Sequence, residues 1–185
     1  MNRLVALLAA GLVVLVGCSQ KQEANTTLPP TSAAETTEAL PSRGPADMPM
    51  PDEARMRDAA GAEAFVRYYI ELINRTSTVM DAEPLRDFSD GCRECNRIAD
   101  DTDEDAAAGY SYRGGELTIT YIEARESDPT SVSFTADQAA MTVVDRSGQP
   151  VEGLVFDALP RLSSGATLRW DEPMQSWIMV GLTLG

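Results

Sequence analysis

The hydrophobic pattern changes its period at Gly114-Gly115, and this change constrains the fold more than any other feature of the chain. Before it, apolar residues recur at three- and four-residue intervals, as on one face of a helix. After it, apolar and polar residues alternate, as along a half-buried strand. Helices followed by antiparallel strands are typical of an α+β domain, so we expect N-terminal helices packed on a sheet.

The strongest helical pattern lies in residues 61–76, GAEAFVRYYIELINRT, with Asp58 as the expected N-cap. Counted from Ala62, further apolar residues follow after three, four, seven, eight and eleven positions, which places them all on one continuous stripe. We expect this stripe to be buried. It consists of Ala62, Phe65, Val66, Tyr69, Ile70 and Ile73, widened by Tyr68 and Leu72.

Two further helices are expected before the change of period. A short one lies in residues 81–90, DAEPLRDFSD, with Asp81 as its cap and Pro84 in its first turn. A third lies in residues 94–109 and ends at Gly109. The side chains expected to be buried from the short helix are Leu85 and Phe88.

The strands begin with residues 116–124, ELTITYIEA, in which strict alternation places Leu117, Ile119 and Tyr121 on one face. The last two expected strands flank DEPMQ, which is a good hairpin signal. The final strand is apolar on both faces, as in the middle of a sheet or under a helix. These two strands are expected in residues 165–170 and 176–184, and the strands between them and the first are expected in residues 131–136, 138–145 and 151–158.

The N-terminus has the organisation of a signal peptide. Arg3 precedes an unbroken apolar run from Leu4 to Val16. As a helix this run spans on the order of 20 Å, which is short of the ~30 Å hydrocarbon core of a membrane. Leu15-Val16-Gly17-Cys18 resembles the lipobox of bacterial lipoproteins. This resemblance implies that residues 1–17 are removed and that Cys18 becomes the lipid-modified first residue.

The segment after Cys18 has the composition of a tether. Residues 19–52 are rich in Thr, Pro, Ala and Glu and contain six of the eleven prolines. All aromatic residues lie from Phe65 onward. Such a segment buries too little apolar surface to offset its ordering entropy. We therefore expect a disordered tether over residues 18–52 and a globular domain over residues 53–185.

The domain also resembles an uncharacterised family of actinobacterial lipoproteins. The resemblance depends on EAFVRYYIELIN, on Pro84-Leu85, on a C-x-x-C pair and on a hairpin that contains tryptophan. It implies the cone-like fold of nuclear-transport-factor-2-like proteins, in which a curved sheet wraps a long helix and leaves a cavity. The same fold occurs in isomerases, dehydratases and binding proteins, so it does not identify the function.

Composition excludes several functions. The formal net charge of −14 disfavours nucleic acid and anionic lipid as partners. Histidine is absent, which excludes Ser-His-Asp and Cys-His triads and the H-E-x-x-H zinc site. An enzyme built from this chain would depend on carboxylates, Tyr, Arg or Cys. We expect no cofactor and no metal.

Cys92 and Cys95 remain as a pair once Cys18 carries lipid. Thiols oxidise outside the cytoplasm, so our main interpretation is a small structural disulfide between the second and third helices. A redox-active C-x-x-C is the first alternative, although Glu94 and Asp90 would disfavour the thiolate. A zinc site is the second, and it lacks four ligands.

Residues 100–105, DDTDED, have the D-x-D-x-D spacing of a calcium loop. Ala106 and Tyr112 stand where that loop needs Gly and Glu. A solvated acidic helix face is therefore our interpretation, with weak cation binding as the alternative.

The candidate cavity residues are Tyr68, Tyr69 and Tyr121. In cone-fold isomerases, a carboxylate base works beside a tyrosine that holds an oxyanion. No spacing in this chain places an acid beside one of these tyrosines, and a tyrosine on an apolar helix face is usually part of the core. We name no catalytic residue.

We expect a lipoprotein, anchored on the outer face of the cell membrane through Cys18, that presents a binding or interaction domain and not an enzyme. Its partner would be an unknown envelope protein or a small ligand. A small-molecule carrier or enzyme that uses the cone cavity is one alternative. A structural envelope protein that dimerises through the exposed face of the sheet is another.

The anchor can be tested with a Cys18→Ser variant in the host. We expect this variant to lose labelling by a radioactive fatty acid and cleavage before residue 18, because the thiol is the acceptor of the lipid. The measurement is autoradiography and mass spectrometry of fractionated cells. A Cys18→Ser chain that is cut before residue 18 and still fractionates with membranes would contradict the assignment.

Overall fold

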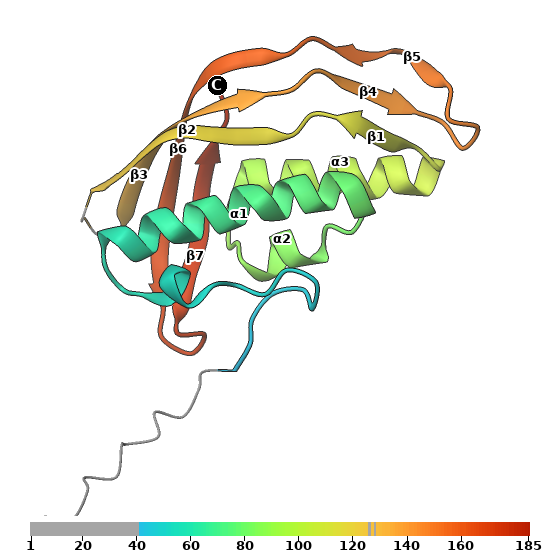
Figure 1. Ribbon diagram of the computed structural model, residues 1–185. Coiled ribbons are helices and arrows are strands. Elements are labelled where there is room, and N and C mark those ends of the chain that lie inside the picture. The colour runs from blue at the N-terminus through green and yellow to red at the C-terminus, as the bar shows by residue number, and fades with distance from the viewer. Residues whose placement is uncertain (1–40, 126, 128) are drawn as a thin grey trace, which may run out of the picture. The chain divides into compact units, whose positions relative to one another are not determined.

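The computed structural model describes residues 41–125, 127 and 129–185, all of which lie in one compact unit. The expected signal peptide, Cys18 and most of the expected tether lie outside the described residues. The unit is α+β, as predicted: helices come first and antiparallel strands follow (Figure 1). None of its described helices is long and apolar enough to cross a membrane.

Helix α1 (Ala59–Val79) begins where the sequence predicts. Asp58 has extended backbone, and its side chain accepts a 2.7 Å hydrogen bond from the backbone nitrogen of Gly61. Every residue of the predicted apolar stripe is buried. Phe65 and Tyr69 are completely buried at its centre.

Two shorter helices and one 3₁₀ turn complete the helical part. The turn η1 (Asp52–Arg55) precedes α1, and α2 (Glu83–Asp87) follows it. The N-cap of α2 is Ala82 and not Asp81, whose carboxylate instead accepts a hydrogen bond from the backbone of Glu83. Leu85 and Phe88 are buried as expected.

Helix α3 (Arg93–Ala108) ends at Gly109, as predicted. Gly109 has φ +79°, in the left-handed region that glycine tolerates best. A Cβ atom at this position would lie 1.9 Å from Nε of Arg146. The end of α3 therefore depends on glycine for both its backbone conformation and its space.

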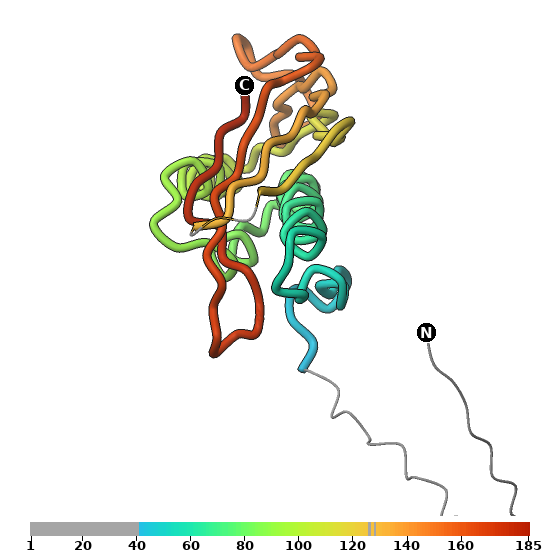
Figure 2. Tube along the Cα trace, turned by 90° about the vertical axis from the view of Figure 1, so that its left-hand side faces the viewer, coloured from blue at the N-terminus to red at the C-terminus, as the bar shows by residue number. Residues whose placement is uncertain are grey.

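Three long strands each bend once, and the bends divide the sheet into two parts. The proximal sheet has the order β2 (Leu117–Arg125), β3 (Thr130–Gln138), β6 (Leu159–Asp171), β7 (Ser176–Thr183). The distal sheet has the order β1 (Ser111–Gly114), β4 (Met141–Val144), β5 (Pro150–Phe156). Because β1 leads into β2, β3 into β4 and β5 into β6, the distal strands arch over the helices (Figure 1). Figure 2 looks nearly along α1 and shows α1 and α3 side by side beneath them.

A bulge in β2 changes which residues face the core. The register with β3 shifts between Ile119 and Tyr121. Leu117 and Ile119 face the core before it, and Ile122 faces the core after it. Tyr121 is 55% exposed, so the prediction that it shares a face with Leu117 and Ile119 is wrong.

The β6–β7 hairpin forms as predicted, and Asp171 pairs with Ser176 at its turn. Strand β7 lies at the end of the proximal sheet and not in its middle. Its outer edge is covered by the segment after α2, because Met179 exchanges backbone hydrogen bonds with Phe88 and Asp90 at 2.9 and 3.0 Å. Helix α3 packs on the same strand.

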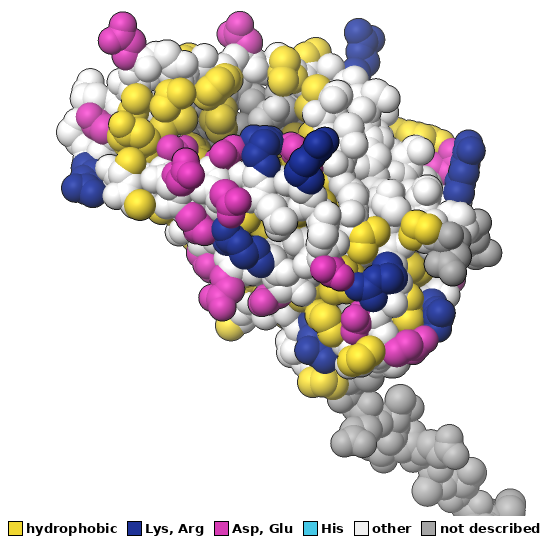
Figure 3. All heavy atoms as spheres, turned by 180° about the vertical axis from the view of Figure 1, so that it is seen from behind, with side chains coloured by type: hydrophobic (Ala, Val, Ile, Leu, Met, Phe, Trp, Pro, Cys, Tyr) yellow, Lys and Arg dark blue, Asp and Glu magenta, His cyan; other side chains and the backbone are white. Residues whose placement is uncertain are grey.

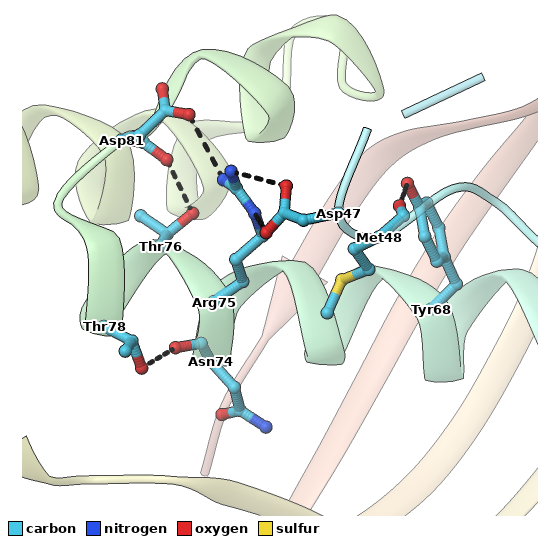
Figure 4. A network of polar contacts seen from close by, with 8 residues as sticks. All are labelled: Asp47, Met48, Tyr68, Asn74, Arg75, Thr76, Thr78 and Asp81. Carbon is cyan, nitrogen blue, oxygen red and sulfur yellow. Dashed lines mark hydrogen bonds and ion pairs between the residues drawn. The ribbon is translucent and has the colours of Figure 1, made fainter. Parts of the chain in front are cut away.

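Residues 41–52, here called the N-terminal strap, pack against α1. Met50 is 6% exposed and belongs to the core, and the hydroxyl of Tyr68 donates to the carbonyl of Met48 at 3.1 Å. Figure 4 shows Arg75 of α1 between Asp47 of the strap and Asp81 after α1. Its guanidinium donates to both oxygens of Asp47, at 2.9 and 3.0 Å, and to Asp81 at 3.2 Å.

The globular domain therefore begins before residue 53, the boundary expected from the composition. The strap is rich in proline, but proline removes backbone freedom as well as hydrogen-bond donors. A segment that is already stiff loses less entropy when it packs. The buried Met50, the ion pair of Asp47 and the hydrogen bonds to the carbonyls of Met48 and Pro41 hold it.

The strap can be tested by comparing two methionines. We expect Met50→Ala to lower the free energy of unfolding by about 2 kcal/mol, because it removes a buried side chain from the core. Met56→Ala is the matched control, since Met56 is 52% exposed. It should change stability by less than about 0.5 kcal/mol. Urea unfolding followed by tryptophan fluorescence measures both, and equal effects would mean that the strap is not part of the core.

Candidate functional site

A pocket of about 240 Å³ lies under the bend of the sheet, between α1, α3 and the strand ends where the proximal and distal sheets meet. Its walls are mainly apolar. A polar rim is formed by Glu94, Arg97, Asp101 and Tyr112. The apolar lining consists of Ile73, Ile98, Leu117, Met141, Leu159, Leu162 and Leu184.

Two further hollows extend this pocket along α3. One, of about 360 Å³, shares Arg97, Asp101, Tyr112 and Met141 with it and continues under the distal sheet to Phe156. The other, of about 530 Å³, shares Glu94 and Leu184 and lies beside the end of β7. We call the three together the α3 groove. Figure 3, from behind, shows hydrophobic side chains gathered over the distal sheet with charged side chains, mostly acidic, along their border.

Two large apolar side chains line the groove without being covered. Phe156 is 46% exposed and Leu159 is 49% exposed, although both line the hollows under the sheet. Their neighbour Val155 is 61% exposed and lines none of the three hollows, as strand alternation predicts for the opposite face. Phe156 and Leu159 therefore face the helices and still contact solvent.

The α3 side of the groove is acidic. Arg97 donates to Glu94 at 2.6 Å and to Asp101 at 2.7 Å, and the guanidinium holds the pKa of Glu94 below its usual value. Glu104 and Asp105 add two more carboxylates to the lining. Arg93 and Arg97 line the groove beside these four acids, so this side keeps a net negative charge. A cation is therefore favoured there over an anion.

The other two acids of the expected run face away from the groove. Arg86 of α2 pairs with Asp100 at 2.7 Å and with Asp103 at 2.8 Å. The last turn of α3 contains no basic residue, so its carboxylates lie at the negative end of the helix dipole. These ion pairs offset part of that unfavourable placement.

Tyr112 of β1 closes the groove against the end of α3. Its hydroxyl donates to the carboxylate of Asp105 at 2.6 Å. Burial and this carboxylate both raise the pKa of Tyr112, because they disfavour the phenolate. The phenol stays protonated at neutral pH, and its proton is used in the hydrogen bond to Asp105.

The predicted cavity tyrosines lie elsewhere. Tyr68 donates to the strap, and Tyr69 donates to the carbonyl of Leu85 at 3.1 Å. Burial raises the pKa of each to about 12. Both belong to the core and neither lines the groove. Tyr121 lies on the outer face, where it donates to Glu123 at 2.7 Å.

Sequence reasoning missed Tyr112, Phe156 and Leu159. Tyr112 lies in β1, whereas Phe156 and Leu159 lie about the β5–β6 bend, and the strand pairing brings them to the same groove. No local spacing marks them. The available signal was weak: a tyrosine three residues after the helix-ending Gly109, and apolar residues where the pattern of β5 reaches its end.

Cys92 and Cys95 form a disulfide at the start of α3. Each is 1% exposed, and Sγ of Cys92 accepts a 3.2 Å hydrogen bond from the backbone of Cys95. Thiol exchange needs access of a thiolate to a sulfur atom, so this burial favours the structural interpretation over the redox one. The bridge fixes the first turn of α3, next to Glu94 of the groove.

The expected acidic run is helical throughout, since residues 100–105 lie inside α3. It therefore does not form the loop that the calcium-binding alternative needs. Within the described ranges, no group of acidic or cysteine side chains is arranged to hold a metal ion.

No protein-family model matches the chain. No curated protein sequence matches it either. Among solved structures, it resembles the intermembrane space region of the chloroplast protein ARC6, with a TM-score of 0.49, 18% identity and coverage of 70% of this chain and 97% of that one. It also resembles the protein Aln2 from a Streptomyces species, with a TM-score of 0.37, 14% identity and coverage of 65% and 89%. Likenesses this distant do not inform function.

The contact between β1 and α3 can be tested through pH. Because the pKa of Tyr112 is higher in the folded state than the usual value of ~10, the folded protein holds this proton more tightly than the unfolded chain. The stabilisation is complete below pH ~10 and is lost as the pH rises above it. We expect Tyr112→Phe to cost about 1 kcal/mol at pH 7 and to flatten the loss of stability above pH ~10.

Tyr110→Phe is the control, because its hydroxyl makes no hydrogen bond to another side chain or backbone group among the described residues. Thermal unfolding between pH 7 and pH 11 measures both variants. If Tyr112→Phe loses stability above pH ~10 as steeply as the parent chain, the hydroxyl contact does not carry this pH dependence.

Proposed function

We propose that this chain is a membrane lipoprotein, held by lipid on Cys18, whose domain is a non-catalytic binding module with the α3 groove as its binding site. The lipobox resemblance supports the anchor, and the geometry of the groove supports the binding role. The resemblance to actinobacterial lipoproteins of the cone-like fold is part of the same proposal.

The observation that carries the binding role is the exposure of Phe156 and Leu159 inside the groove. Complete burial of such a side chain contributes roughly 1.5–3 kcal/mol. Since each is about half buried already, a ligand that covers it gains on the order of 1 kcal/mol at each position. The groove therefore has affinity for an apolar group before any polar contact is counted.

The rim selects the charge of the ligand. Glu94, Asp101, Glu104 and Asp105 favour a cationic or hydrogen-bond-donating group beside the apolar part. A cationic amphiphile fits both surfaces, and pockets that hold small ligands have volumes of ~300–1,000 Å³. A small-molecule carrier is the second candidate, favoured by the apolar hollow under the bend.

The polar groups of the groove support binding over catalysis. The proton of Tyr112 is held by Asp105, and the raised pKa of the phenol opposes its use as a base. Arg97 is held by two carboxylates. These groups bind one another at the rim and do not converge on one point inside the hollow, as a catalytic constellation would.

The proposal can be tested with residues 19–185, which keep every residue of the described core. We expect decylammonium to bind and decyl sulfate to bind at least tenfold more weakly, because the rim is acidic. Added salt should weaken the binding of decylammonium, because it screens this attraction. Leu159→Lys should weaken decylammonium at least tenfold, since it removes apolar surface and adds a positive charge.

Val155→Lys is the matched control, because it adds the same charge at an exposed apolar residue on the opposite face. Isothermal titration below the micellar concentration measures all three proteins. The proposal fails if Leu159→Lys and Val155→Lys bind decylammonium equally well.

A further inference from the structure

We infer that the natural occupant of the α3 groove is an extended peptide segment of a partner protein, which adds as a strand to the outer edge of β5 and carries both apolar and basic side chains on its groove-facing side. This inference rests on the proposed function and names its ligand class.

The first argument is the edge itself. Strand β6 is paired on both sides from Gly165 to Leu168, and β7 ends opposite Gly165 at Thr183. From Ser164 back to Leu159, only β3 pairs with β6 among the described strands, and β5 ends the distal sheet. A strand added here would continue the line of β7, near the C-terminus in Figure 1.

The usable part of this edge is short. Gly153 has φ +79° where the register with β4 shifts, and Pro160 has no N–H to donate. Between them lie residues 154–159, which extend over on the order of 20 Å. Three of the six exposed large hydrophobic side chains of the described protein fall in this stretch: Val155, Phe156 and Leu159.

An edge strand with exposed apolar side chains attracts another strand, and proteins usually cover or charge such an edge. This edge also borders the groove, because Leu154, Phe156 and Leu159 line its hollows. Side chains alternate across an added strand, so every second one would point into the groove. Backbone hydrogen bonds and apolar pockets would then act on the same segment.

Charge identifies the chemistry of the segment. Asp101, Glu104 and Asp105 of α3 line the wall that faces the distal sheet. Lysine or arginine side chains that face the groove beside the apolar ones would reach this wall. A second copy of the chain fits poorly, because it carries the same acids and the whole chain has a net charge of −14. Residues 154–159 themselves contain an acid, Asp157, and no base.

The test is selection of nine-residue peptides from a random phage library on immobilised residues 19–185, after depletion on the Leu159→Lys variant. We expect the enriched peptides to carry both apolar residues and Lys or Arg at every second position, the positions that face the groove. The best peptide, made synthetically, should bind with micromolar affinity. Its affinity should fall at least tenfold when alternate backbone nitrogens are methylated. Hydrogen exchange should show new protection at the amides of residues 154–159.

Two protein variants sharpen the result. Glu104→Lys should weaken the synthetic peptide at least fivefold, whereas Glu71→Lys on the exposed side of α1 should not, because Glu71 is remote from the groove. Both lysine variants at residues 104 and 71 change the net charge equally, so a general charge effect would affect them alike.

Each other outcome overturns the inference. These outcomes are enriched peptides without apolar and basic residues at every second position, a bound peptide that tolerates backbone methylation, or a library that yields no enrichment. Protection of residues 154–159 in a peptide-free dimer would identify a second copy as the occupant. If decylammonium still binds as described above, the proposed function stands and only the strand addition is wrong.

Discussion

The packing of α1 under the bent sheet is the interaction on which the rest of the structure depends. Its apolar stripe is completely used by the proximal strands, the strap and α2, with Phe65 and Tyr69 at the centre. Only its last turns, at Ile73 and Ser77, reach the hollow under the bend. The distal strands arch over the last turns of α1, which contact β1, and over α3, which is not an apolar helix.

Helix α3 has only a narrow apolar face, and this leaves the groove open. Its buried residues are Cys95, Ala99 and Thr102, which are too small to reach far into the distal sheet. The disulfide holds its first turn, Arg86 holds its middle and Tyr112 holds its end. Exposed ion pairs contribute only ~0–1 kcal/mol each. The helix is thus positioned without a continuous apolar interface, and the space that such an interface would occupy is the groove.

The sequence predicted what depends on neighbouring residues. Asp58 caps α1 and Gly109 ends α3 because capping is decided within one turn of helix. The face of Tyr121 was predicted wrongly because a bulge is decided by the pairing of two strands. The strap was missed because its contacts, Met50 with the core and Asp47 with Arg75, join segments that are distant along the chain. The groove was missed for the same reason, since only the bend brings Tyr112, Phe156 and Leu159 together.

The acids of α3 oppose self-association of the apolar edge of β5. An edge that exposes Phe156 and Leu159 would pair with its own copy if nothing opposed it. The acids beside it repel a second copy, which carries the same charges, and attract a basic segment. Both effects are electrostatic, and the Debye length falls from ~8 Å at 0.15 M salt to ~3 Å at 1 M. High salt should therefore weaken the pairing of this edge with a basic peptide and, by the same screening, permit its pairing with itself.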